Sequence, residues 1–73
     1  MITLVTGATG NVGHAIVAEL LSSGREVRAL VRSAERARGL LPDTVHLVEG
    51  DVTDPASVQA AMVGVRCVYH VAG

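Results

Sequence analysis

The residues best suited to do chemistry form a glycine-rich segment near the start of the 73-residue chain, Thr6-Gly7-Ala8-Thr9-Gly10-Asn11-Val12-Gly13. Gly7 would allow a tight exit from a strand, Gly10 would let a pyrophosphate approach the backbone, and Gly13 would let a helix pack closely on a sheet. The alternative is a turn with helix-packing glycines and no ligand. A Walker-type phosphate loop is excluded, because it needs a lysine and the chain has none.

A second candidate site follows the apolar residues 26–31, where the chain reads Arg32-Ser33. An NAD site carries an acid here, about 20 residues after the glycine turn, to bind the ribose 2′-hydroxyl. A guanidinium instead grips a 2′-phosphate with two hydrogen bonds, and Ser33 or Arg36 would add to that grip. NADP is therefore favoured, with NAD as the alternative. For Arg36 and Arg38 the alternative interpretation is the solvated face of a helix.

These segments must be positioned by an alternation of strands and helices. The apolar and β-branched runs predict strands at residues 2–6, 26–31, 45–49 and 65–71, and the helical periodicity predicts helices at residues 11–23, 34–41 and 55–63. Such alternation implies parallel strands joined by right-handed crossovers. We expect the α/β class: half of a doubly wound Rossmann fold, with four strands in the order 3-2-1-4 and three crossover helices, forming one domain over residues 1–73. A ligand should then bind at the carboxyl ends of the first and last strands.

Three motifs together resemble the short-chain dehydrogenase/reductase superfamily, in its extended or atypical branches, over the whole chain. The glycine segment is similar to the family's nucleotide turn, Gly50-Asp51-Val52-Thr53-Asp54 to its segment after the third strand, and His70-Val71-Ala72-Gly73 to the end of its fourth. The resemblance implies that Asp51 and Val52 border the adenine, and that Ala72 and Gly73 lie beside the middle of the cofactor. The predicted cofactor-binding residues are Gly7, Thr9, Gly10, Asn11, Val12, Gly13, Arg32, Ser33, Asp51, Val52, Ala72 and Gly73.

Other polar residues receive structural interpretations. His14 follows the turn, where some relatives carry a basic residue near the 2′-phosphate, and the alternative is a half-solvated helix histidine. Asp54 precedes a proline, so it is interpreted as a helix cap. Cys67 is expected to be buried in the last strand. The three histidines are far apart in sequence and no cysteine pair joins them, so no metal site is expected.

The superfamily's catalytic pair, Tyr-x-x-x-Lys, has no match in this chain. There is no lysine, and Tyr69 lies in the last predicted strand, where we expect it to pack against a helix. We therefore predict no catalytic residue and expect this chain alone to be inactive. The predicted function is an NAD(P)-binding module of an oxidoreductase, epimerase or dehydratase. Two alternatives stay open: an atypical NADPH-dependent reductase that works without the pair, and a ligand-free structural fragment that self-associates.

Composition and charge bear on partners and location. Six basic and seven acidic residues give a net charge of −1, which provides no basic field for nucleic acid or an anionic membrane surface. No apolar run reaches the roughly 20 residues of a spanning helix, so we expect a cytoplasmic protein.

The last predicted strand has strong β character, and it contains no lysine or proline that would oppose pairing of its open edge with another strand. We expect a homodimer, formed through that strand or by exchange of a strand-helix unit.

Overall fold

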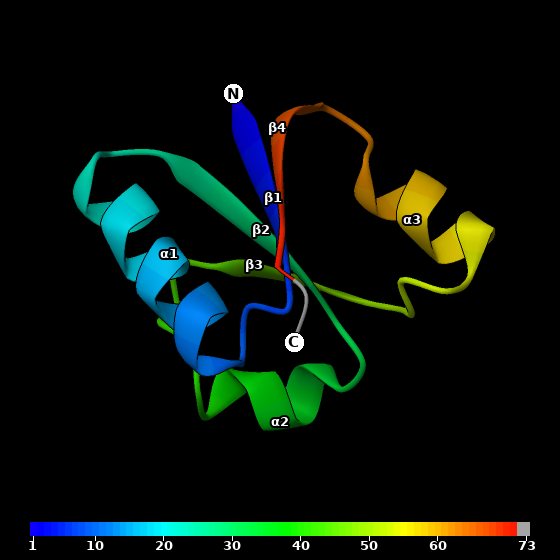
Figure 1. Ribbon diagram of the computed structural model, residues 1–73, viewed down its shortest axis with the longest axis horizontal. Coiled ribbons are helices and arrows are strands. Elements are labelled where there is room, and N and C mark those ends of the chain that lie inside the picture. Colours follow the sequence, from blue (N-terminus) through cyan, green and yellow to red (C-terminus); the bar gives the residue numbers. More distant parts are fainter. Residues whose placement is uncertain (72–73) are drawn as a thin grey trace.

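The computed structural model describes residues 1–71 as one parallel sheet with helices on both of its sides (Figure 1). The elements are β1 (Ile2–Thr6), α1 (Asn11–Ser22), β2 (Glu26–Val31), α2 (Ala34–Arg38), β3 (His46–Glu49), α3 (Pro55–Ala61) and β4 (Val65–His70). The strand order is β3-β2-β1-β4 and every pair is parallel. The predicted Rossmann-like half fold is confirmed. Ala72 and Gly73, two of the predicted cofactor residues, lie outside the described residues.

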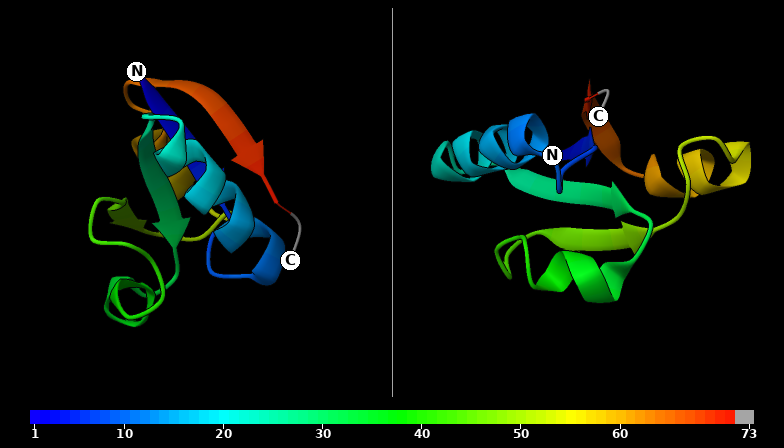
Figure 2. Two further views of the ribbon diagram at one scale, coloured as in Figure 1. Left: turned by 90° about the vertical axis from the view of Figure 1, so that its left-hand side faces the viewer. Right: turned by 60° about the horizontal axis from the view of Figure 1, so that its bottom comes forward.

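The two central strands place buried apolar residues on both faces, because helices cover both. Val5 and Ala29 are fully buried in a cluster with α1 and α2, whereas Leu4 and Leu30 are buried in a smaller cluster with α3. Figure 1 shows α1 and α3 on opposite sides of the strands, and Figure 2 shows α2 alongside β3. Apolar residues on both faces of a strand are typical of a parallel sheet with two covered faces.

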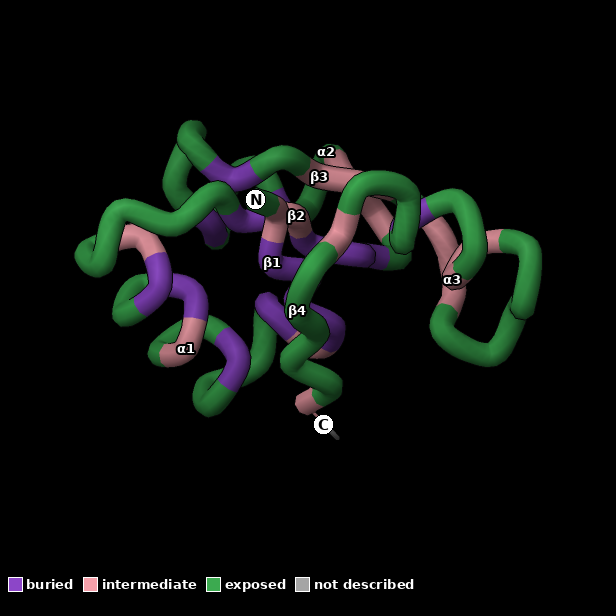
Figure 3. Tube along the Cα trace, turned by 90° about the horizontal axis from the view of Figure 1, so that it is seen from above, coloured by how far each residue is buried: buried purple, intermediate pink, exposed green. Residues whose placement is uncertain are grey.

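The strand β4 differs from the others in its exposure. It pairs with β1 alone among the described strands, and its residues from 66 to 70 are exposed (Figure 3). Cys67 is therefore exposed, and the prediction that it would be buried is wrong. Tyr69 is also 39% exposed, more than the predicted packing on a helix would leave. The physical reason is that β4 lies at the edge of the described sheet and α3 covers only its start.

The first helix ends one residue earlier than predicted, and the other two end two or three residues earlier. α2 ends at Arg38, and the amides of Leu40 and Leu41 both donate to the carbonyl of Ala37 at 2.9 Å in a tightened last turn. Leu41 still packs into the core, which explains why the periodicity continued to that residue. α3 ends at Ala61, since Gly64 adopts a positive φ of 78° and turns the chain into β4.

A side chain from β2 holds the end of α3 against the sheet. The Arg28 Nη1 atom donates to the carbonyl oxygens of Ala61 at 2.7 Å and Val63 at 2.6 Å. A cation at a helix C-terminus suits both the free carbonyls and the helix dipole. These two hydrogen bonds were not predicted from the sequence. None of the helices in the described part of the chain is long and apolar enough to cross a membrane.

Candidate functional site

A cleft of about 660 Å³ opens at the carboxyl ends of the strands. Its lining comes from the end of β1 and the glycine turn, from the end of β2 together with α2, and from the residues that follow β3 and β4. Carboxyl ends of parallel strands meet at one edge of the sheet, so four separate segments of the chain contribute to one site. This is the place where open α/β sheets bind ligands.

The glycine turn joins β1 to α1 at one wall of the cleft. Gly7 has a φ of 69°, and the Gly10 amide donates to the Gly7 carbonyl at 3.2 Å. A Cβ on Gly7 would lie 2.5 Å from the carbonyl oxygen of Val71, and a Cβ on Gly13 would overlap the carbonyl of Gly7. The fold itself therefore requires glycine at positions 7 and 13.

Gly10 differs from the other two glycines. Its φ of −77° suits any residue, and a Cβ there would meet only the Gly7 carbonyl oxygen, at an ordinary contact distance of 3.5 Å. The protein does not itself need glycine at this position. The absence of a side chain at Gly10 leaves open backbone in front of α1, which is the space that a closely approaching ligand would use.

The start of α1 leaves donors free for such a ligand. Gly10 is the N-cap and makes no side-chain cap, and the first turn contains no acidic residue. The first three helical amides, those of Asn11, Val12 and Gly13, have no acceptor within the helix. Asn11 and Val12 are exposed, whereas Gly13 is buried. Uncapped amides together with the positive end of the helix dipole suit an anion.

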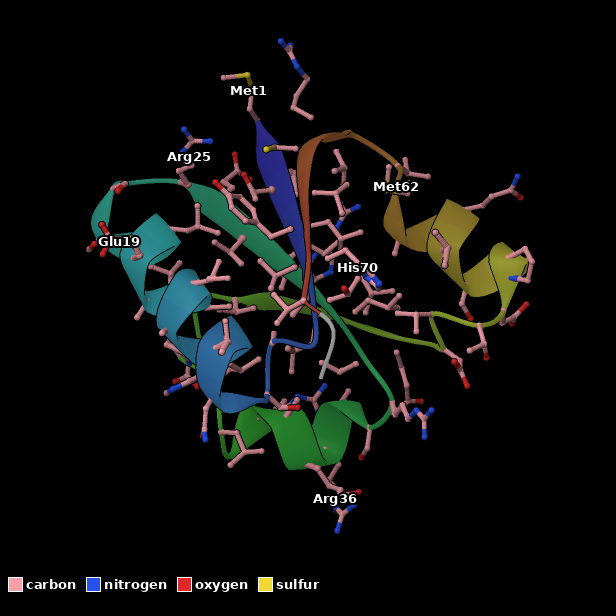
Figure 4. All side chains as sticks on the ribbon, viewed as in Figure 1. Met1, Glu19, Arg25, Arg36, Met62 and His70 are labelled. Carbon is pink, nitrogen blue, oxygen red and sulfur yellow. The ribbon has the colours of Figure 1, made fainter. Side chains whose placement is uncertain are left out.

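The opposite wall of the cleft carries positive charge. Arg32, Ser33 and Arg36 all line it (Figure 4 labels Arg36 on α2). The Ser33 hydroxyl oxygen accepts from the Arg36 amide at 3.3 Å and so caps α2, as its helix-capping position predicts. The Ala34 amide donates to the Glu49 Oε2 atom at 3.0 Å. Glu49 was missed by the sequence analysis, because it is adjacent to this segment only through the pairing of β3 with β2.

The segment after β3 is shaped by its own carboxylates. Asp51 Oδ1 accepts from the Thr53 amide at 2.8 Å and from the Thr53 hydroxyl at 2.7 Å. These hydrogen bonds, the one from the backbone first, hold the pKa of Asp51 below its ordinary 3.8, and the charge of Arg32 adds to the effect. Asp54 caps α3 through the Ala56 amide at 3.2 Å, as expected. Val52 lines the cleft and Asp51 lies next to it in sequence.

Two polar side chains meet on the cleft floor, between β1 and β4. Thr6 Oγ1 and His70 Nδ1 are 2.6 Å apart, and both residues line the cleft. Figure 4 labels His70. His70 belongs to the motif that resembles the end of the family's fourth strand, but its contact with Thr6 was not predicted from the sequence. In residues 1–71 no group of three or more His, Cys, Asp or Glu side chains is arranged to hold a metal ion.

Of the predicted site residues, the structure brings together at the cleft Gly7, Thr9, Arg32, Ser33 and Val52. Gly10, Asn11 and Val12 lie just beyond it, exposed at the start of α1, and Gly13 is buried beneath the turn. His14 is an exposed residue of α1 and does not line the cleft.

Comparison with known proteins agrees with this geometry. A family model described as NAD(P)H-binding matches residues 7–73. The sterol demethylase protein B of Methylococcus capsulatus is 42% identical over 72 residues, covering 99% of this chain and 22% of that protein. A short-chain dehydrogenase/reductase superfamily protein from Agrobacterium tumefaciens, solved with bound NAD, is 32% identical with a TM-score of 0.79, covering 100% of this chain and 20% of that one. An NADPH-dependent quinone oxidoreductase from Escherichia coli is 28% identical with a TM-score of 0.84, covering 99% of this chain and 26% of that one. The chain thus spans only about a fifth to a quarter of the length of these proteins.

Proposed function

Because this chain belongs to the NAD(P)H-binding family, we propose that its cleft holds a dinucleotide with the pyrophosphate against Gly10 and the start of α1, and that it prefers NADP to NAD. The open backbone at Gly10 is the observation that carries the proposed position of the pyrophosphate. The fold has room for a side chain at position 10, but a side chain there would exclude a bound phosphate. The uncapped helix start supplies the donors for the anion. The cofactor, when bound, supplies the hydride chemistry, and this chain binds and orients it.

The preference for NADP rests on the charge of the wall formed by Arg32 and Arg36. Both residues line the cleft, Arg32 directly after β2, where a dinucleotide site recognises the ribose, and Arg36 on the adjacent helix α2. A 2′-phosphate gains charge-assisted hydrogen bonds there that a 2′-hydroxyl does not. The likeness to solved structures does not choose between the cofactors, since one neighbour is named with NAD and another as NADPH-dependent.

The remaining cofactor residues follow from the same placement. Thr9, Asn11 and Val12 would border the phosphates at the turn, while Asp51 and Val52 would border the adenine at the far wall. Ala72 and Gly73 stay predicted contacts to the middle of the cofactor. In this proposal the chain is the NAD(P)-binding module of an oxidoreductase, epimerase or dehydratase. A cytoplasmic location also stays a prediction.

Titration calorimetry with NADPH and with NADH tests the proposal. The native chain should bind both weakly and NADPH more tightly, and Arg32→Asp should narrow or reverse the ratio of the two affinities. Arg66→Asp is the matched control, because Arg66 is an exposed arginine of β4 that does not line the cleft. An unchanged ratio in Arg32→Asp would remove Arg32 from the site. A native chain that binds neither cofactor would favour the ligand-free alternative.

The alternative of an atypical NADPH-dependent reductase has its own test. A turnover assay with NADPH and simple carbonyl or quinone substrates should show no activity for the chain, since it has no lysine to serve as the usual partner of a catalytic tyrosine. Measurable turnover would instead establish this alternative.

The homodimer is the second proposal about partners. It is supported by the exposure of β4, where Val68 is 43% and Tyr69 39% exposed, next to an edge that pairs with no further strand among the described residues. Unpaired backbone groups on such an edge attract another strand. A second copy of the chain could extend the sheet there, with two-fold symmetry.

A further inference from the structure

The last residue of β3 brings a carboxylate to the segment that follows β2. Glu49 pairs in register with Val31, and the Gly50 amide donates to the Val31 carbonyl at 2.8 Å. From this position the Glu49 Oε2 atom accepts the Ala34 amide at 3.0 Å. Only Ser33 lies between Arg32 and Ala34, so the carboxylate is held beside the segment proposed to recognise the ribose of the cofactor.

Glu49 forms no ion pair with a cation among the described residues. Among residues 1–71 the one ion pair joins the amino terminus to Glu26, and Glu49 is exposed. Only its Oε2 atom accepts a hydrogen bond from the described residues, so Oε1 is a spare acceptor. The Ser33 hydroxyl oxygen accepts the Arg36 amide, so two hydrogen bonds hold the backbone at residues 33–36: this one and the one from the Ala34 amide to Glu49.

We propose that Glu49 is a specificity-determining residue of the cofactor site, and that it opposes Arg32. This inference rests on the proposed function. A carboxylate repels a 2′-phosphate and accepts a hydrogen bond from a 2′-hydroxyl, which is the role an acid plays at the end of the second strand in NAD sites. In this chain Arg32 directly follows the second strand, and the acid, Glu49, is the last residue of the neighbouring strand β3.

The consequence is a cofactor preference that is weaker than Arg32 alone would produce. The repulsion weakens the binding of NADP. The 2′-hydroxyl of NAD is neutral, so the carboxylate does not repel it and can accept its hydrogen bond. Because the groups are exposed, the effect is screened by salt and should amount to a several-fold change in relative affinity.

The variant that isolates this charge is Glu49→Gln, which keeps an oxygen to accept the Ala34 amide. Glu35→Gln is the matched control, since it removes the same charge from the first turn of α2 and Glu35 makes no hydrogen bond through its side chain within the described residues. Dissociation constants for NADPH and NADH are measured by calorimetry at low salt and at high salt, with circular dichroism to confirm folding. Glu49→Ala serves as a second variant. It removes the charge together with the acceptor for the Ala34 amide, and it should change the affinity ratio in the same direction because the charge is what repels the 2′-phosphate.

The expected result is that Glu49→Gln raises the NADPH-to-NADH affinity ratio about three- to tenfold at low salt, less at high salt, and by clearly more than Glu35→Gln does. Binding of both cofactors with an unchanged ratio in the Glu49 variants would overturn the inference and leave the proposed function standing. An equal rise in the Glu35 control would also overturn it, because the effect would then be one of general charge. Failure of the native chain to bind either cofactor would overturn the proposed function itself.

Discussion

The hydroxyl of Thr6 and the imidazole of His70 are joined across the ends of two neighbouring strands, with Oγ1 and Nδ1 2.6 Å apart. Thr6 is only 6% exposed, and among the described residues its hydroxyl has one side-chain partner, the imidazole of His70. The register of β1 with β4 sets Thr6 opposite His70. The hydrogen bond therefore holds together the floor of the cleft at the point where the two strands end.

Replacing His70 with alanine should lower the free energy of unfolding by about 1–2 kcal/mol, because it leaves a buried hydroxyl without a partner. In a Thr6→Val background the same change should cost less. Urea denaturation of the two single variants and the double variant measures the coupling. A coupling of zero would mean that the contact contributes nothing to stability.

The glycines of the turn should divide into two groups on substitution. Gly10→Val should abolish NADPH binding with little effect on stability, since the fold has room for a Cβ there. Gly13→Ala should destabilise the fold by at least about 2 kcal/mol, because its Cβ would overlap the backbone of Gly7. Thermal unfolding and calorimetric titration of both variants separate the two effects. Retained affinity in a folded Gly10→Val chain would make the turn purely structural.

The depressed pKa of Asp51 predicts a pH effect of known sign. A carboxyl group with a lowered folded-state pKa stabilises the fold at pH values above its unfolded-state pKa, and this contribution is lost as the pH falls through the folded value, below 3.8. Thr53→Val removes the hydroxyl donor and keeps the amide donor, so the pKa should move part of the way up. An NMR titration of the Asp51 carboxyl group measures it. Thr44→Val, an exposed substitution elsewhere, should leave the titration unchanged.

Arg28 should matter for stability although it is outside the proposed site. Arg28→Met keeps the apolar stem and removes both hydrogen bonds to the end of α3, so we expect a loss of about 1–3 kcal/mol. Amide exchange should accelerate first in α3. Arg66→Met, at an exposed position of β4, is the control and should change little. Equal effects of the two variants would contradict the structural role given to Arg28.

Self-association should depend on concentration and on the exposed face of β4. Sedimentation of the native chain over a concentration series should show a monomer–dimer equilibrium, and Val68→Lys should shift it toward the monomer, because a charge on the edge strand opposes pairing. A clean monomer at high concentration in the native chain would refute the proposed dimer. A continuous range of larger species would indicate non-specific aggregation.

The strands and the glycine turn were predictable because each is encoded locally, and the strand order followed from the usual topology of doubly wound folds. The β-branched runs, the helical periodicity between them and the capping roles of Ser33 and Asp54 all act within a few residues. The ties of Arg28 to Ala61, Ala34 to Glu49 and Thr6 to His70 were not predictable, since they join residues 33, 15 and 64 positions apart. These contacts depend on the register between neighbouring strands and on where each helix packs. The sequence pattern predicts which strands are neighbours but not their register. The burial of Cys67 was wrong for a related reason, because an apolar strand pattern does not show whether an element covers the strand.

The contact between Gly7 and Val71 restricts which substitutions the turn can ever accept. A Cβ at position 7 would meet the main-chain carbonyl of Val71, which is present whatever side chain occupies position 71. A smaller residue at position 71 therefore cannot relieve the clash, and a genetic screen should yield no second-site suppressor there for a substitution of Gly7. During sequence drift, position 7 should stay glycine while the side chain at position 71 changes freely among those that fit the core.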